Sequence, residues 1–197
     1  MTLILASKSE TRRQILQAAA VPFEVRTGAT DEEAVKQRCR ALGMDARTLA
    51  LALAEQKALD VDAEVGEFIL GADQTWECSD GSMLDKPASR EDAERQLRTL
   101  SGRRHWLHSA AVIAVDGRSI WRSAESVAMD VRQLSDDFIH FYLDAEYEQV
   151  RYNVGCYRIE GLGAQLFEAV EGSHFAILGL PLLPLLGWLR ECGIISR

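Results

Sequence analysis

The sequence predicts an α/β fold with a single mixed central sheet flanked by helices. Two observations point to this class: short apolar strands alternate with amphipathic helices, and no repeat or linker divides the 197 residues. The apolar fraction of 47% is enough to fill a core. We therefore expect one domain over residues 1–197, with a lobe near residues 120–155.

The first half of the chain is expected to open with a strand, a polar loop and a helix. Apolar residues predict the strand at 3–6, and helical spacing of apolar residues predicts the helix at 10–20. A strand at 23–25, a polar capping turn at 30–33, a helix at 48–60 and a central strand at 68–71 follow. Residues 79–82 have the composition of a hairpin turn.

The second half continues the alternation of helices and strands. Ser89 is expected to cap a helix that runs through Leu100. Strands are predicted at 105–115, 126–132 and 167–170, with helices at 136–143 and 182–192. The glycine-rich segment 155–164 is typical of a loop that approaches a strand or a ligand closely. Glu160 lies in it between apolar residues, so we expect a buried carboxylate that needs hydrogen-bond donors.

Charge and composition exclude several classes of protein. A net charge of −8 argues against binding to nucleic-acid polymers, which requires clustered Lys and Arg. The four cysteines are widely spaced without a metal-binding pattern, which is typical of reduced cytoplasmic thiols. The apolar segment 175–189 contains Pro181 and Pro184 and is too short for a bilayer span. We expect a cytoplasmic protein with no signal peptide and no membrane segment.

The segment Ile69 to Thr75 leads an apolar strand into a turn that presents Asp73 at the strand end. Such an aspartate is often only a turn former, but Lys86 follows in Asp-Lys-Pro. A carboxylate and an ammonium group at one strand end suit an anionic substrate with a bound metal. Together they predict a phosphate site.

The loop after the first strand adds hydroxyl and guanidinium groups. Ser7, Ser9 and Arg12 lie where a strand meets a helix, which suits a phosphate cradle. The alternative is that Ser9 only caps the helix and the arginines lie on the surface. Glu32 is a candidate second carboxylate for a metal or a base, and otherwise a solvated helix start. The sequence around Lys57 does not by itself decide the role of this residue.

Other catalytic patterns are not found in the sequence. The chain has no P-loop motif, and the four histidines show no metal-ligand spacing, so we interpret them as structural or surface residues. Ser109 and Cys156 lack an evident base partner, which argues against a triad hydrolase.

Taken in order, the motifs resemble those of the Maf-like nucleotide pyrophosphatases over nearly the whole chain. The matching segments are Leu-Ala-Ser-Lys-Ser at 5–9 with Arg12, Lys57-Ala58, Gly-Ala-Asp at 71–73, Asp-Lys-Pro at 85–87, Leu-Ser-Gly-Arg at 100–103, Glu-Gly-Leu-Gly at 160–163 and Gly-Leu-Pro at 179–181. The resemblance implies the architecture of Maf proteins and inosine triphosphatases. It implies a cytoplasmic house-cleaning enzyme, typically a homodimer, which uses Mg²⁺ or Mn²⁺ to cleave nucleoside triphosphates into monophosphate and pyrophosphate.

The resemblance also implies roles for single residues. Asp73 matches the catalytic carboxylate, as base, metal ligand or both, and Glu32 matches a second metal-site carboxylate. A shift of one residue would put Asp31 or Glu33 in the place of Glu32. Four further residues match positions that bind substrate: Ser7, Arg12, Lys57 and Lys86.

Three positions bear on the choice of base. The family loop usually reads Ser-Pro-Arg-Arg, whereas this chain has Glu10 and Thr11 before Arg12, so Thr11 is a specificity position. Gln74 and Glu160 resemble the branch that acts on 7-methyl-GTP. A carboxylate can accept both N–H groups of the guanine edge, which thymine and uracil do not offer. Trp76 is a candidate for stacking on the base, with a core tryptophan as the more frequent case.

Three alternatives remain open from the sequence. The first is a pyrophosphatase of the same family for dTTP or UTP. The second is a catalytically weak nucleotide-binding regulator of cell division, against which the presence of both Asp73 and Lys86 argues. The third is an interaction module that docks a partner through its apolar segment 176–189, which more often forms core or a dimer surface.

Overall fold

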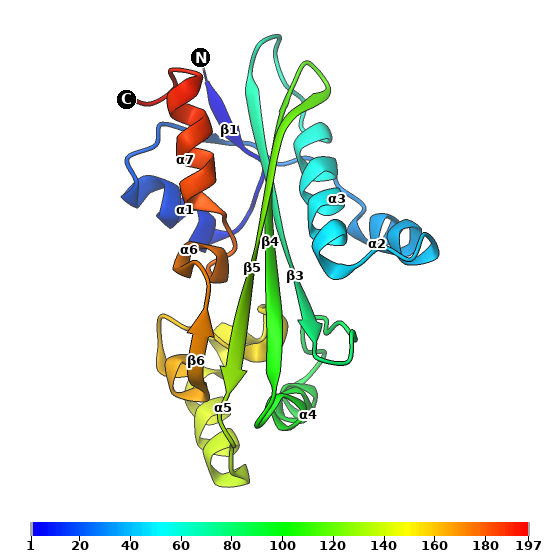
Figure 1. Ribbon diagram of the computed structural model, residues 1–197, viewed down its shortest axis with the longest axis vertical. Helices are drawn as coiled ribbons and strands as arrows, with labels where there is room; N and C mark the ends of the chain where they lie inside the picture. Colours follow the sequence, from blue (N-terminus) through cyan, green and yellow to red (C-terminus); the bar gives the residue numbers. More distant parts are fainter. Residues whose placement is uncertain (1, 197) are drawn as a thin grey trace. The chain divides into compact units, whose positions relative to one another are not determined.

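The computed structural model describes residues 2–196 and confirms an α/β fold with one mixed six-stranded sheet (Figure 1). The strand order is β2-β1-β3-β4-β5-β6. β1 pairs in parallel with both β2 and β3, whereas β5 and β6 are antiparallel. None of the helices described between residues 2 and 196 has the length and apolar character that a bilayer crossing requires.

The elements follow the predicted alternation. The strands are β1 (Leu3–Leu5), β2 (Glu24–Val25), β3 (Phe68–Cys78), β4 (Arg104–Val115), β5 (Arg118–Val131) and β6 (Phe167–Glu171). The helices are α1 (Glu10–Ala18), α2 (Glu32–Ala41), α3 (Ala46–Leu59), α4 (Arg90–Leu100), α5 (Asp136–Val150), α6 (His174–Ile177) and α7 (Leu182–Glu191), with 3₁₀ turns η1 (Val154–Cys156) and η2 (Leu162–Leu166).

The chain divides into two compact units. Unit 1 contains residues 1–74, 108–126 and 173–197, and unit 2 contains residues 75–107 and 127–172. The strands β3, β4 and β5 each contribute residues to both units.

In unit 1, helices cover both faces of the sheet because successive strand residues point to opposite sides. Leu3 and Leu5 join a core with residues of α1 and α7, whereas Ile4 joins a separate core with Ala58 of α3. Figure 1 shows α1 and α7 beside β1, and α3 on its other side. Every residue of β1 is buried, as expected for a parallel strand with helices on both faces.

Side-chain caps fix where most helices begin. Ser9 accepts the Arg12 amide at the start of α1, and Ser89 accepts the Asp92 amide at the start of α4. The expected capping turn at 30–33 is the start of α2, where Asp31 accepts the Ala34 amide. The predicted caps therefore place the helix starts within one residue.

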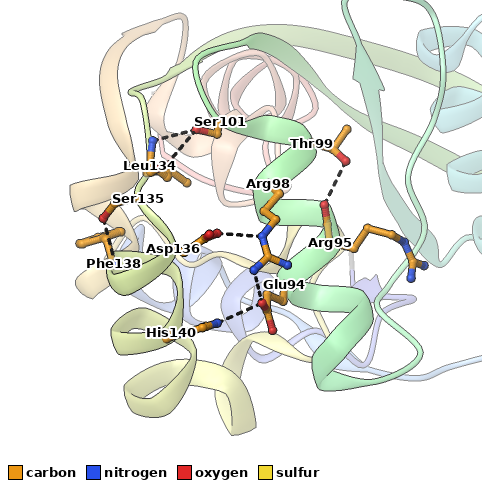
Figure 2. Close-up of polar contacts among 10 residues, drawn as sticks. All are labelled: Glu94, Arg95, Arg98, Thr99, Ser101, Leu134, Ser135, Asp136, Phe138 and His140. Carbon is orange, nitrogen blue, oxygen red and sulfur yellow. Dashed lines mark hydrogen bonds and ion pairs between the residues drawn. The ribbon is translucent and has the colours of Figure 1, made fainter.

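In unit 2, α4 and α5 pack together, and a network of polar side chains joins them (Figure 2). Arg98 bonds to Asp136 at 2.8 Å and to Glu94 at 2.5 Å, and Glu94 also bonds to His140 at 3.0 Å. All four side chains are at least 22% exposed, so this network holds the solvent side of the helix pair.

Several elements differ from the sequence-based expectation. The turn at 79–82 forms, with Cys78 N–H bonded to the Ser82 carbonyl at 2.7 Å, but a loop and α4 follow it, not a second strand. Instead β4 and β5 are joined by Asp116 and Gly117, both with positive φ (49° and 72°), as in two-residue hairpin turns. β3, β5 and α5 are also longer than predicted, and α2 was not expected as a helix. Asp73 therefore lies within β3, and the expected turn that would present it at the strand end is wrong, because the strand continues to Cys78.

Candidate functional site

The ammonium group of Lys57 joins two carboxylates in unit 1. Its Nζ lies 2.5 Å from Asp73 Oδ1 and 2.8 Å from Glu32 Oε1. The Asp73 side chain is 11% exposed and that of Glu32 50%, so the cluster runs from the interior to solvent. We call these three residues the Lys57 cluster. It brings together three side chains that the sequence singled out separately.

Close packing at Gly71 positions Lys57 against Asp73. A Cβ atom at Gly71 would lie 2.0 Å from the Ala54 carbonyl oxygen and 2.7 Å from the Ala58 nitrogen. Only glycine lets α3 approach β3 this closely, since any side chain would force the two backbones apart. Because Lys57 lies between these α3 residues and Asp73 lies two residues after Gly71, the contact sets their distance.

The geometry distinguishes Glu32 from its acidic neighbours. The Asp31 carboxylate caps α2, and Glu33 lies 3.7 Å from Arg40. Glu32, the first residue of α2, extends to Lys57 instead. Of the three acidic residues at 31–33, Glu32 is therefore the one whose carboxylate shares the Lys57 ammonium group with Asp73.

Arg12 is buried beside the cluster and bonds mainly to backbone. Its Nε donates to the Gly179 carbonyl and its Nη1 to the Ala72 carbonyl, both at 2.8 Å, and Nη1 also donates to Ser7 Oγ at 3.3 Å. Burial lowers the pKa of Arg12, while Asp73 and Glu32 raise it through their charges. Arg12 is thus no surface residue, although Ser9 caps the helix as the alternative interpretation expected.

The formal charges of four residues of this region cancel. Arg12 and Lys57 carry two positive charges, and Asp73 and Glu32 carry two negative ones. A triphosphate would therefore need further positive charge. Over residues 2–196 there is no group of three or more His, Cys, Asp or Glu side chains that could enclose a metal. Two carboxylates completed by phosphate oxygens are nevertheless a common Mg²⁺ arrangement, so the residues fit such an ion.

Gln74 makes contacts within unit 1 through its amide nitrogen. Nε2 donates to Ser109 Oγ at 2.9 Å and to the carbonyls of Ala176 and Ile177 at 2.9 and 3.0 Å. Ser109 in turn donates to the Ala176 carbonyl at 2.6 Å. Gln74 thus holds α6, and the sequence missed this role of Ser109 because its partners Gln74 and Ala176 lie 35 and 67 residues away. Thr11 is half-buried on α1.

The remaining predicted residues belong to unit 2. Lys86 is exposed in the loop before α4. Glu160 is also exposed, so the expected burial of its carboxylate is wrong: it lies in a surface turn between η1 and η2. Trp76 is 1% exposed and stacks on His105 with ring centroids 4.7 Å apart, so it is a core tryptophan and not a stacking surface for a base.

A second buried group surrounds His105, which is fully buried. His105 Nε2 lies 2.7 Å from the Tyr157 hydroxyl, and Phe167 packs edge-on to Tyr157 at 4.9 Å. We call Trp76, His105, Tyr157 and Phe167 the His105 cluster. Burial lowers the pKa of His105 to about 3, against a weaker opposing effect of Asp130. His105 is therefore a structural residue, as the lack of metal-ligand spacing among the histidines indicated.

Comparison with known proteins places the chain in a family. Residues 2–192 match the model of the Maf-like protein family. A nucleoside triphosphate pyrophosphatase of Sphingopyxis alaskensis is 47% identical over 198 residues, covering 100% of both chains. A protein of the same name from Nitrobacter winogradskyi is 46% identical, covering 98% of this chain and 95% of its own.

One relative carries a more specific name. A 7-methyl-GTP pyrophosphatase of Rhizobium meliloti is 45% identical over 195 residues, covering 98% of each chain. These similarities extend over the whole sequence and are not confined to the motifs around Asp73. The chain therefore belongs to the Maf-like protein family.

Proposed function

We propose that this protein hydrolyses nucleoside triphosphates between the α and β phosphates, with 7-methyl-GTP as its preferred substrate. The observation that carries the proposal is the Lys57 cluster, in which an ammonium group holds Asp73 and Glu32 together. Membership in the Maf-like family and the names of the relatives support the reaction.

Asp73 and Glu32 are the residues proposed to hold a divalent cation, Mg²⁺ or Mn²⁺. When bound, the cation would neutralise phosphate charge as a Lewis acid. The charge balance supports this proposal, because the charges of Arg12, Lys57, Asp73 and Glu32 cancel and leave no excess to match a triphosphate.

The chain's own residues then have distinct roles in the proposed reaction. Asp73 accepts the proton of the attacking water, whose oxygen bonds to the α-phosphorus while the bridging oxygen leaves with pyrophosphate. Lys57 pairs with Asp73 at 2.5 Å and offers positive charge to the phosphates. Arg12 donates to the Ala72 carbonyl, next to Asp73, and so orients the catalytic carboxylate. Ser7 is the proposed hydroxyl contact to phosphate, and Lys86 a further ammonium contact.

The preference for 7-methyl-GTP rests on the base edge. Exposed Glu160 has a carboxylate that can accept N1–H and N2–H₂ of guanine together, and the positive charge of the methylated base strengthens the pair. In this proposal Gln74 affects base selection indirectly, because its amide bonds to two carbonyls of α6. Thr11 of α1 is a second specificity position. The relative named a 7-methyl-GTP pyrophosphatase supports the assignment.

Release of pyrophosphate from a panel of triphosphates tests the proposal. The panel contains 7-methyl-GTP, GTP, dTTP and UTP, each with Mg²⁺ or Mn²⁺ and with a chelator as control. We expect the highest kcat/KM for 7-methyl-GTP and loss of activity with the chelator. A preference for dTTP or UTP would keep the reaction and overturn the substrate. No release from any member would favour a nucleotide-binding regulator of cell division.

We further propose that the protein is a cytoplasmic homodimer, as the family resemblance implies. Light scattering at micromolar concentration would give twice the mass of 21.9 kDa. A monomer mass at all concentrations would contradict this.

A further inference from the structure

A buried amide in unit 2 joins two loops that both carry proposed substrate contacts. Gln96 on α4 is 7% exposed. Its Nε2 donates to the carbonyl of Asp85 at 3.3 Å, and its Oε1 accepts from Cys156 Sγ at 3.2 Å. Asp85 directly precedes Lys86, and Cys156 lies four residues before Glu160. One side chain therefore contacts both segments.

The segment at Cys156 is an unusual turn that its partners hold in place. Cys156 has a φ of 58°, in the left-handed region that non-glycine residues rarely adopt. Its carbonyl accepts from the Tyr142 hydroxyl of α5 at 3.3 Å, and its thiol donates to Gln96. Burial raises the pKa of this thiol to about 12, so it keeps the proton that it donates. A backbone conformation of this kind persists where the surroundings determine it strongly.

The Lys86 loop has no regular secondary structure. Residues 82–87 form neither helix nor strand, and both Asp85 and Lys86 are exposed. Segments of this kind open at low free energy unless buried contacts fix them. Removing one partner of a buried polar contact leaves the other group without its bond, which costs more than the bond itself contributes. Gln96 is therefore placed to set the position of both loops at once.

We propose that Gln96 is a positioning residue that links the Lys86 loop to the turn leading into Glu160, and so couples phosphate binding to base selection. The coupling rests on the proposed function, in which Lys86 contacts phosphate and Glu160 contacts the base. Gln96 touches neither substrate nor metal in this scheme. It acts through the Asp85 carbonyl on one side and the Cys156 thiol on the other.

Four variants test the link. Gln96→Met keeps the length of the side chain and removes both hydrogen bonds, and Cys156→Ala removes only the thiol donor. Cys156→Ser keeps a donor and serves as the conservative rescue. Arg98→Met is the matched control, because it breaks the α4 contacts with Asp136 and Glu94 that Figure 2 shows and touches neither loop.

The first readout is substrate selection, measured as kcat/KM for 7-methyl-GTP divided by that for UTP. Gln96→Met is expected to lower this ratio about tenfold, with a raised KM, as outer contacts that orient a binding group commonly do. Cys156→Ala lowers it in the same direction, and its effect and that of Gln96→Met are less than additive in the double variant. Cys156→Ser and Arg98→Met keep the wild-type ratio. An equal loss of selectivity in Arg98→Met would overturn the proposal.

The second readout does not depend on activity. Hydrogen exchange is measured for residues 83–88 and 153–163 in each variant. Gln96→Met is expected to raise exchange in both segments, and Arg98→Met in neither. A rise in only one segment would disprove the link even in an active enzyme. If the wild-type protein hydrolyses no triphosphate, the proposed function has failed, and exchange alone decides whether Gln96 couples the loops.

Discussion

The Lys57 cluster of unit 1 and the His105 cluster of unit 2 both gather titratable side chains, but they treat charge differently. In the Lys57 cluster the ammonium group forms ion pairs with two carboxylates at 2.5 and 2.8 Å. In the His105 cluster the imidazole and the phenol are enclosed by aromatic rings, and burial disfavours their charged forms. Paired charged groups that extend to solvent are available for chemistry, whereas buried neutral groups stabilise the fold.

The comparison of the two clusters predicts the largest loss of activity for a change at Asp73. Asp73→Asn removes the charge that would hold a metal and accept a proton, so we expect kcat to fall by about 10³-fold. The melting temperature stays near that of wild type, because Lys57 keeps Glu32 as a partner. The matched control is Asp60→Asn, which changes a carboxylate of the same unit that accepts from Gln56 at 2.7 Å, and it should keep full activity. Wild-type turnover in Asp73→Asn would mean that the catalytic group lies elsewhere.

Lys57 is expected to show the next largest effect. Lys57→Met leaves two carboxylates facing each other, which favours protonation of one of them. We expect kcat/KM to fall by about 10²-fold and the acidic limb of its pH profile to move to higher pH. Lys57→Arg keeps the charge and should restore the position of that limb. An unchanged profile in Lys57→Met would show that the ammonium does not control the carboxylates.

The His105 cluster predicts an effect on stability and none on activity. Unfolded histidine titrates near 6.5, whereas folded His105 stays neutral down to about pH 3. The unfolded state therefore binds more protons between these values, and the free energy of unfolding falls as the pH is lowered through 6.5. The loss is on the order of 2 kcal/mol at pH 5.

Urea unfolding at pH 7 and pH 5 measures this loss. His105→Gln keeps a side chain that can bond to Tyr157, and it should flatten the pH dependence of the unfolding free energy. A wild-type slope in His105→Gln would assign the acid sensitivity to other groups.

The smallest expected effect concerns Glu160, an exposed carboxylate of unit 2. An effect on substrate choice would show that unit 2 contributes to function as well as to stability. Glu160→Gln should lower the preference for guanine over uracil nucleotides about tenfold, because an amide accepts only one of the two N–H groups well. Competition between 7-methyl-GTP and UTP measures it. The control is Glu148→Gln, an exposed carboxylate of the same unit. If the substrate ranking does not change, the base is read without Glu160.

Local patterns in the sequence predicted most of the fold. Caps at Ser9 and Ser89 and apolar runs at β1 and β3 depend on neighbours a few residues away, which the sequence displays directly. The hairpin between β4 and β5 was not predicted, although Asp116-Gly117 has the composition of its turn. The sequence also assigned Asp73, Glu32 and Lys57 to one site, but only through the family resemblance.

Contacts between distant segments decided the remaining details of the site. The sequence by itself determined the alternation of elements, the family and the presence of Asp73, Lys57 and an acidic run. Tertiary structure decided that Glu32 is the carboxylate facing Lys57, that Trp76 lies in the core, and that Glu160 is exposed. The physical reason is that helix phase and close packing, as at Gly71, select which side chain of a local pattern meets another.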